Sequence, residues 1–191
     1  MYTLGIELST QSVKTVVLDL TTTDIIHCNA ISYDEQFPRY GTRGGVVPSE
    51  SPDIRHTSPL MLIEALDVAF DNLAQAGIDL SKLQAIKADG MQHCTVYTHD
   101  RFVKTVNSLD PKRPLAGQLG DCFSRKTAPI WEDRSTDQEA AYLTKAMKQT
   151  GGIEKLTGNR AELRFPAAQI LKWASQNPQA YDQTSHIWIL S

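Results

Sequence analysis

Apolar residues recur along the chain with two spacings, one typical of strands and the other of helices. Three segments near the start, residues 3–8, 13–20 and 25–33, are rich in Val, Ile, Leu and Thr, and short polar turns separate them. Strands that follow one another this closely pair as antiparallel neighbours. The opening of the chain therefore predicts a three-stranded antiparallel meander.

Helical spacing begins after a polar loop over residues 38–52. Ser58 and Pro59 provide an N-cap and a first-turn proline for a helix that ends at Gly77. The apolar face of this helix consists of Leu62, Leu66, Ala69, Phe70 and Leu73.

Further helices are predicted in the second half of the chain. Thr136 and Glu139 have the spacing of a capping box, which indicates that a helix begins there. A short helix is expected within residues 104–127, another over residues 167–176, and a last one from Asn177-Pro178 onwards.

Two more strands are predicted at about residues 82–88 and 94–99. Strands that alternate with helices after such an opening are typical of an α/β domain with a mixed sheet. The 191 residues are enough for one well-cored domain and few for two. The chain ends in an apolar, strand-like run over residues 187–191, and we therefore expect it to be a segment of a longer polypeptide.

Composition excludes several classes of partner. Hydrophobic residues make up 41% of the chain and charged residues 21%, the net charge is −3, and no basic run exceeds Pro111-Lys112-Arg113, so nucleic acid is not an expected partner. No segment has the ~20 apolar residues that span a bilayer. The start of the chain lacks the features of a secretory signal, and Cys28, Cys94 and Cys122 lack disulfide-type spacing, which favours a cytoplasmic location.

The turn between the first two strands is the main chemical signal. It consists of Ser9, Thr10 and Gln11, with Glu7 just before it and Lys14 just after it. Amides and hydroxyls in such a turn can bind phosphate oxygens, and a carboxylate beside them can hold a hydrated divalent cation. The alternative is an ordinary edge hairpin with a polar turn.

A second polar segment, Gly90-Met91-Gln92-His93, follows a predicted strand. A glycine at a strand end permits close backbone approach or positive φ, and the polar residues after it can point into a pocket. An isolated histidine on a strand is often structural, so both interpretations of His93 stay open. A zinc site shared with His99 is disfavoured, because six extended residues place the two imidazoles roughly 20 Å apart.

Two later segments add candidate contacts for a polyol. In Trp131-Glu132-Asp133, the indole can pack against the C–H face of a sugar and Asp133 can accept hydroxyl hydrogen bonds. A loop carboxylate near a helix N-terminus is an equal alternative for Asp133. Further on, we assign a structural role to Arg160 and a binding role to Arg164, whose guanidinium offers five donors.

Together these motifs resemble those of the FGGY carbohydrate kinases, which are part of the sugar-kinase, heat-shock-protein and actin superfamily. The first turn matches the phosphate-binding hairpin of that family, although Glu7 stands where the family has Asp. The segment at residues 90–93 matches a sugar-contacting motif except at Met91, where Gln is common. Residues 156–165, Leu-Thr-Gly-Asn-Arg-Ala-Glu-Leu-Arg-Phe, resemble the eukaryotic D-xylulose kinases in particular.

The resemblance implies a ribonuclease H-like fold and the phosphorylation of a ketopentose, most specifically D-xylulose, with ATP and Mg²⁺. It implies these roles: phosphate binding by Ser9, Thr10, Gln11 and Lys14, metal binding by Glu7, and sugar binding by Gln92, His93 and Arg164, with Asp133 as a further candidate.

The resemblance also implies what these residues lack. The family's catalytic aspartate and adenine pocket lie in a second half that no segment here matches, so we expect residues 1–191 to be most of an N-terminal sugar-kinase domain and to be inactive alone. The alternatives are a kinase for ribulose, glycerol, gluconate or another polyol, and a non-catalytic carbohydrate-binding or regulatory protein. The oligomeric state stays open, a homodimer included.

Overall fold

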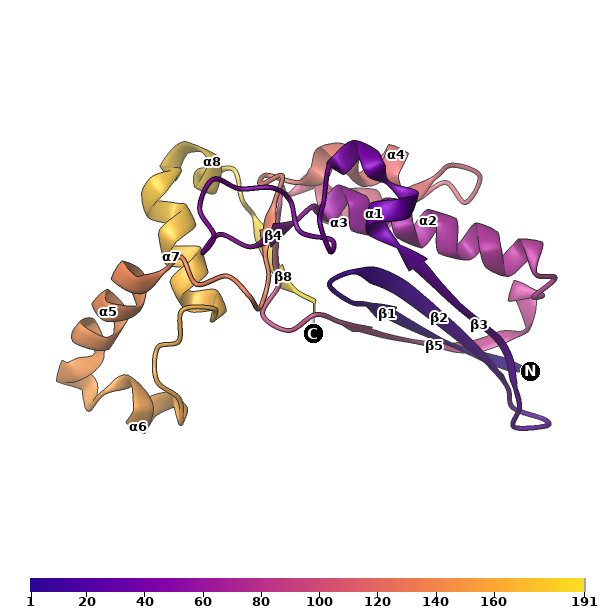
Figure 1. The fold of residues 1–191 in the computed structure, drawn as a ribbon, viewed down its shortest axis with the longest axis horizontal. Helices are drawn as coiled ribbons and strands as arrows, with labels where there is room; N and C mark the ends of the chain where they lie inside the picture. Colours follow the sequence, from indigo (N-terminus) through magenta and orange to yellow (C-terminus); the bar gives the residue numbers. More distant parts are fainter. Residues whose placement is uncertain (191) are drawn as a thin grey trace.

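The computed structural model describes residues 1–190 and is built around a mixed four-stranded sheet (Figure 1). The strands β1 (Tyr2–Leu8), β2 (Ser12–Asp19) and β3 (Ile25–Ser32) pair as antiparallel neighbours, and β5 (Leu83–Gly90) lies parallel to β1. The order across the sheet is β3-β2-β1-β5. Because β1 and β5 run in the same direction, the turn after β1 and the segment after β5 lie at the same end of the sheet.

The helix α2 (Pro59–Gln75) covers one face of this sheet and packs its apolar side into the core. The Ser58 side chain accepts a hydrogen bond from the Met61 amide at 3.4 Å, which confirms the predicted N-cap. The chain leaves the helix through Gly77, whose φ is +76°. The core between helix and sheet is aliphatic: Leu4, Ile6, Val13, Val17, Met61, Leu62, Ala65, Ala69 and Leu73. Full burial of one large aliphatic side chain contributes about 1.5–3 kcal/mol.

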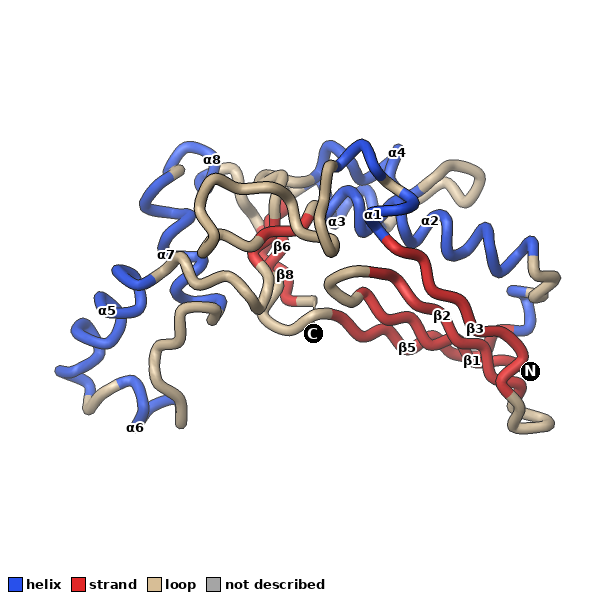
Figure 2. The backbone as a smooth tube through the Cα atoms, in the orientation of Figure 1, coloured by secondary structure: helices blue, strands red, loops and turns tan. Residues whose placement is uncertain are grey.

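The rest of the chain forms two small sheets and short helices, some of them beside α2 and others beyond the end of the four-stranded sheet (Figure 1). The strand β6 (Thr95–Thr98) pairs with β8 (His186–Ile189), and β4 (His56–Thr57) pairs with β7 (Ala128–Pro129), both antiparallel. The remaining helices are α1 (Tyr33–Gln36), α3 (Arg101–Val106), α4 (Leu115–Leu119), α5 (Asp137–Ala146), α6 (Ile153–Thr157), α7 (Pro166–Gln176) and α8 (Pro178–Asp182). Figure 2 shows loops gathered between the sheet and helices α5 to α8.

Most predicted elements occur within two residues of their expected bounds, and one local prediction is wrong. Thr136 occupies the N-cap position of α5, but its side chain makes no cap hydrogen bond. Its hydroxyl donates to the carbonyl of Leu163 instead, so no capping box forms with Glu139. The terminal strand is observed as β8, and Ser191 lies outside the described residues. Over residues 1–190, no helix combines the length and apolarity needed to cross a membrane.

Candidate functional site

The first hairpin turn offers free backbone donors. Ser9 closes the turn, because its amide and its hydroxyl both donate to the carbonyl of Ser12, at 3.0 and 2.8 Å. The amides of Thr10 and Gln11 donate no hydrogen bond to any residue between 1 and 190. Two unpaired amides beside two hydroxyls form the kind of concave donor group that binds an anion.

A loop that contains two glycines packs against this turn, and sequence analysis did not predict the contact. Gly44 and Gly45 have φ of +60° and +76°, and a Cβ on Gly45 would lie 1.9 Å from the carbonyl oxygen of Thr10. Asp34 holds the loop, accepting hydrogen bonds from the Gly44 amide at 2.6 Å, the Gly45 amide at 3.0 Å and the Thr42 hydroxyl at 2.7 Å. Partial burial would raise the pKa of Asp34, but these three donors lower it. In the sequence, the adjacent pair Gly44-Gly45 is the feature from which this loop could have been predicted.

Glu7 and Lys14, the two charged residues that flank the turn, contact each other. They are register partners across β1 and β2, and Lys14 Nζ donates to Glu7 Oε2 at 2.9 Å. Both side chains are about half exposed, at 46% for Glu7 and 48% for Lys14. An exposed pair of this kind is weak and can open when a ligand competes for either partner. Residues 1–190 contain no cluster of three metal-ligating side chains, so a cation at Glu7 would need water or phosphate oxygens as further ligands.

The hairpin turn and the segment after β5 share one cavity of about 310 Å³. It is lined by Glu7, Ser9, Thr10, Gly90, Met91, Gln92 and Trp131. The Trp131 indole Nε1 donates to the Thr10 hydroxyl at 3.1 Å, which fixes the aromatic ring against the turn. Gln92 is exposed here, whereas Met91 is 6% exposed and belongs to the apolar core. A methionine at position 91 therefore serves packing.

His93 turns towards a different part of the chain. Its φ of +61° is unusual for a residue with a Cβ and rotates the side chain out of the strand direction. The imidazole packs against the Phe165 ring with 5.0 Å between the ring centroids. Burial lowers the pKa of His93, and the positive charge of Arg164 lowers it further. The structure thus packs His93 against the residue that follows Arg164, and a neutral imidazole can donate and accept hydrogen bonds.

A larger cavity of about 760 Å³ adjoins the first, and Trp131 lines both. Its walls are Pro52, Asp53, Arg55, Trp131, Glu132, Arg134, Arg160, Glu162, Leu163 and Arg164. Arg55 donates to Glu132 at 3.0 and 3.1 Å, and Arg160 forms an ion pair with Glu162. This pairing agrees with a structural role for Arg160. Arg134 and Arg164 form no ion pair within residues 1–190, so their guanidinium donors are free for a ligand.

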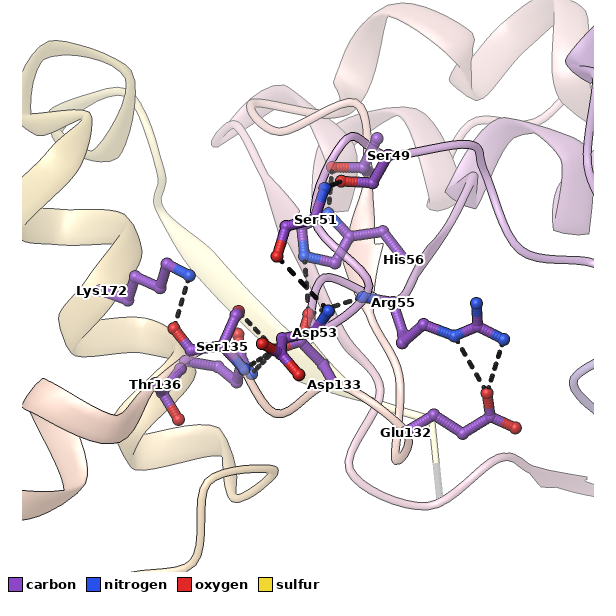
Figure 3. A network of polar contacts seen from close by, with 12 residues as sticks. Ser49, Ser51, Asp53, Arg55, His56, Glu132, Asp133, Ser135, Thr136 and Lys172 are labelled. Carbon is purple, nitrogen blue, oxygen red and sulfur yellow. Dashed lines mark hydrogen bonds and ion pairs between the residues drawn. The ribbon is translucent and has the colours of Figure 1, made fainter.

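Asp133 does not face either cavity. The side chain has no exposed surface, and its oxygens accept hydrogen bonds from the Arg55 amide and from the Ser135 amide and hydroxyl (Figure 3). Gln169 Nε2 also donates to Asp133. A sugar hydroxyl has no access to a carboxylate enclosed in this way. The predicted sugar contact of Asp133 is therefore wrong. The carboxylate holds its own loop from inside, which agrees with the alternative of a loop carboxylate before a helix. Sequence could not reveal the enclosure, because the donors come from distant elements.

His56 completes this network. Its Nε2 lies 3.3 Å from Asp133 Oδ2, and its Nδ1 lies 3.1 Å from the Thr127 hydroxyl. Burial lowers the pKa of His56 despite the nearby carboxylate, so the ring is neutral and donates its Nε2 hydrogen to Asp133. Burial alone would raise the pKa of Asp133, but hydrogen bonds from His56, Ser135 and Arg55 hold it well below its usual range.

Comparison with solved structures defines the class of protein. The structure of a xylulose kinase from Brucella ovis matches 99% of this chain with a TM-score of 0.72 at 17% identity, and the chain covers 32% of that protein. At this identity the likeness establishes the fold, and the α/β domain with a mixed sheet is the fold of the sugar kinases. No family model matches the chain.

Sequence comparison shows which of the sugar kinases the chain resembles. The chain is 35% identical over 189 residues to the xylulose kinase of Mus musculus and 36% identical over 189 residues to xylulose kinase 2 of Arabidopsis thaliana. These matches include 98% of the chain and 34% of each relative, so the chain spans about a third of the length of the curated relatives it matches. The resemblance to eukaryotic xylulose kinases inferred from the motifs is confirmed.

Proposed function

We propose that this chain forms the sugar-binding and phosphate-binding part of an ATP-dependent carbohydrate kinase that transfers the γ-phosphate of ATP to a ketopentose, specifically D-xylulose. The observation that carries the proposal is the hydrogen bond from Trp131 Nε1 to the Thr10 hydroxyl. It joins the turn with free amides to the cavity that holds Arg164, so a phosphoryl donor and a polyol would meet across one indole ring. Positioning of this kind supplies about 7–11 kcal/mol of a transfer barrier.

The polyol side of the site consists of Gln92, His93 and Arg164. Arg164 presents unpaired guanidinium donors, the neutral imidazole of His93 packs on the neighbouring Phe165, and the exposed Gln92 amide offers both donors and acceptors. A sugar in the cavity would hydrogen-bond to these groups and pack its C–H face on Trp131. Asp133 supports the loop from inside.

The phosphate side of the site consists of the amides of Thr10 and Gln11, the hydroxyls of Ser9 and Thr10, and the ammonium of Lys14. Lys14 would exchange its exposed contact with Glu7 for a phosphate oxygen when the nucleotide binds. The single carboxylate of Glu7 fits a hydrated Mg²⁺, which in phosphoryl transfer neutralises the charge on the phosphates.

No segment of this sequence matches the motif that carries the base in the resembled family. We infer that the base and the adenine pocket lie in the remaining two thirds of a full-length kinase, that residues 1–191 form most of its N-terminal, ribonuclease H-like domain, and that they do not catalyse transfer alone. The exposure of β5, whose central residues are all open to solvent, supports this proposal, because a parallel strand is normally covered.

The test measures ADP formation with D-xylulose, D-ribulose, glycerol and D-gluconate, using both residues 1–191 and the full-length protein. We expect turnover only in the full-length protein, with the highest kcat/KM for D-xylulose. Enzyme-like turnover by residues 1–191 would refute the inactivity proposal, and a preference for another polyol would refute the substrate.

A second candidate, a carbohydrate-binding protein without kinase activity, is favoured by the Glu7–Lys14 pair, which occupies both charged groups of the phosphate side. Calorimetric titration separates the two. Sugar binding that ignores ATP and Mg²⁺ in the full-length protein would support the second candidate.

A further inference from the structure

Two buried side chains, Thr136 and Gln169, donate to one backbone carbonyl beside the larger cavity, and a third, Asp133, holds one of them. Thr136, which has no exposed surface, donates its hydroxyl to the carbonyl of Leu163. Gln169 of α7, 2% exposed, directs its Nε2 to the same carbonyl at 3.5 Å and to Asp133 Oδ1 at 2.6 Å. We call Asp133, Thr136 and Gln169 the carbonyl clamp. None of the three lines the larger cavity.

The orientation of the Gln169 amide follows from its partner. An ionised carboxylate only accepts hydrogen bonds, so the nitrogen of the amide must face Asp133. Its second hydrogen then points to the Leu163 carbonyl. A short hydrogen bond to a buried charge is stronger than one between neutral groups, and it fixes the amide in this direction.

The carbonyl of Leu163 belongs to the peptide plane that leads into Arg164. Fixing this plane fixes the direction in which the Arg164 side chain leaves the backbone. The Phe165 amide donates to the Glu162 carbonyl at 3.1 Å, so the segment is also a tight turn. Arg164 itself has no ion pair in the described chain, and the side chain is exposed, so contacts of its own do not hold it in place.

We propose that Gln169, together with Thr136, is a positioning residue that fixes the Leu163 carbonyl and thereby holds the Arg164 guanidinium in the wall of the larger cavity, next to the Phe165 ring that packs on His93. The functional meaning of this position rests on the sugar-binding role proposed for Arg164. The placement of the guanidinium can be tested without any sugar, because its charge acts on His93.

The experiment follows the C2 proton of His93 by NMR during pH titration of the chain, and a His93→Gln variant assigns the signal. Arg164→Gln removes the charge and sets the largest expected rise in the pKa of His93. Gln169→Met keeps an unbranched side chain of similar length and removes both donors. We expect it to raise the pKa of His93 by part of the Arg164→Gln effect. Gln176→Met is the control, since Gln176 is an exposed residue of the same helix.

An unchanged His93 pKa in a folded Gln169→Met chain would overturn the proposal, provided that Arg164→Gln raises it. An unchanged pKa in Arg164→Gln would overturn it as well, because the guanidinium would then lie elsewhere. If Gln169→Met does not fold, Thr136→Val removes the other donor to Leu163 with little change in shape, and the same two outcomes apply.

A second measurement separates this proposal from the proposed function. In the full-length protein, we expect Gln169→Met to raise the KM for D-xylulose about 3- to 10-fold and to leave the KM for ATP unchanged. The rise is smaller than the full loss of a hydrogen bond to a charged group would cause, because Arg164 is displaced and not removed. Loss confined to kcat would contradict positioning of a sugar ligand. A protein without sugar turnover would refute the proposed function, while the NMR titration would still decide where Arg164 lies.

Discussion

Gly45→Ala tests whether the glycine loop sets the position of the phosphate turn. A Cβ at this residue would lie 1.9 Å from the carbonyl oxygen of Thr10, whereas real Cβ atoms essentially never approach closer than 3.0 Å. The turn or the loop must therefore move by about 1 Å, since backbone atoms cannot rotate away as a side chain would. Functional geometry tolerates about 0.5 Å, and a displacement of about 1 Å can cost 10²-fold in rate.

The stability change has two parts. A positive φ costs an alanine about 1–2 kcal/mol, and the overlap with Thr10 raises the total to about 2–4 kcal/mol. For a chain of this size, about 1 kcal/mol lowers the Tm by roughly 2–4 °C, so we expect a fall of about 5–15 °C. Circular dichroism during heating measures the Tm, and titration with ATP and Mg²⁺ in the full-length protein measures nucleotide affinity.

Gly41→Ala is the matched control. Gly41 has a φ of +62°, but nothing lies within 4 Å of its added Cβ, so only the conformational cost applies. We expect Gly41→Ala to lower the Tm by a few degrees and to leave nucleotide affinity unchanged. Equal effects of the two substitutions on both measurements would show that the approach of Gly45 to Thr10 does not position the turn.

Three more predictions concern charge and aromatic contacts. Glu7→Asp in the full-length protein should preserve or raise kcat, measured as ADP release, because the shorter carboxylate is the residue found in the resembled family; a large loss would show a site built around glutamate. Trp131→Phe keeps an aromatic wall but removes the donor to Thr10, and should raise the KM for sugar about 5-fold, the value of one hydrogen bond; an unchanged KM would contradict the bridging role. Urea unfolding of residues 1–191 should show stability falling as the pH drops below about 6.5 and again below about 4. The folded-state pKa is lowered for His56 and for Asp133, so in each window the unfolded chain takes up protons that the folded chain refuses. His56→Gln should shrink the upper step and leave the part that comes from His93, whose pKa is also lowered, and an upper step of unchanged size would refute the assignment.

Local pattern was sufficient for most of the secondary structure. Alternation of apolar residues identified β1, β2 and β3, and Ser58 with Pro59 marked the start of α2, because these signals act within a few residues along the chain. The capping box at Thr136 failed for a tertiary reason. The Leu163 carbonyl, from a distant loop, took the hydroxyl that would have capped the helix.

Some residues of the candidate site could be predicted from the sequence, and others became evident only in the structure. Sequence identified Thr10, Gln92, His93 and Arg164 as polar residues in settings that suit ligands. The structure places Thr10, Gln92 and Arg164 in the walls of two adjoining cavities and packs His93 against Phe165. Sequence analysis assigned no positioning role to Gln169, because a glutamine on the inner face of a helix has no local signature of a role in a site.

The residue types, the turn chemistry and the alternation of strands and helices are properties of neighbouring residues, and the sequence alone determined them. Only the tertiary structure decided that Asp133 is enclosed, that Glu7 contacts Lys14 and that His93 packs on Phe165. The physical reason is that these contacts depend on the register of strands and on the packing of α7 against the Asp133 loop. Burial and charge pairing are set by groups far apart in the chain, which no local pattern records.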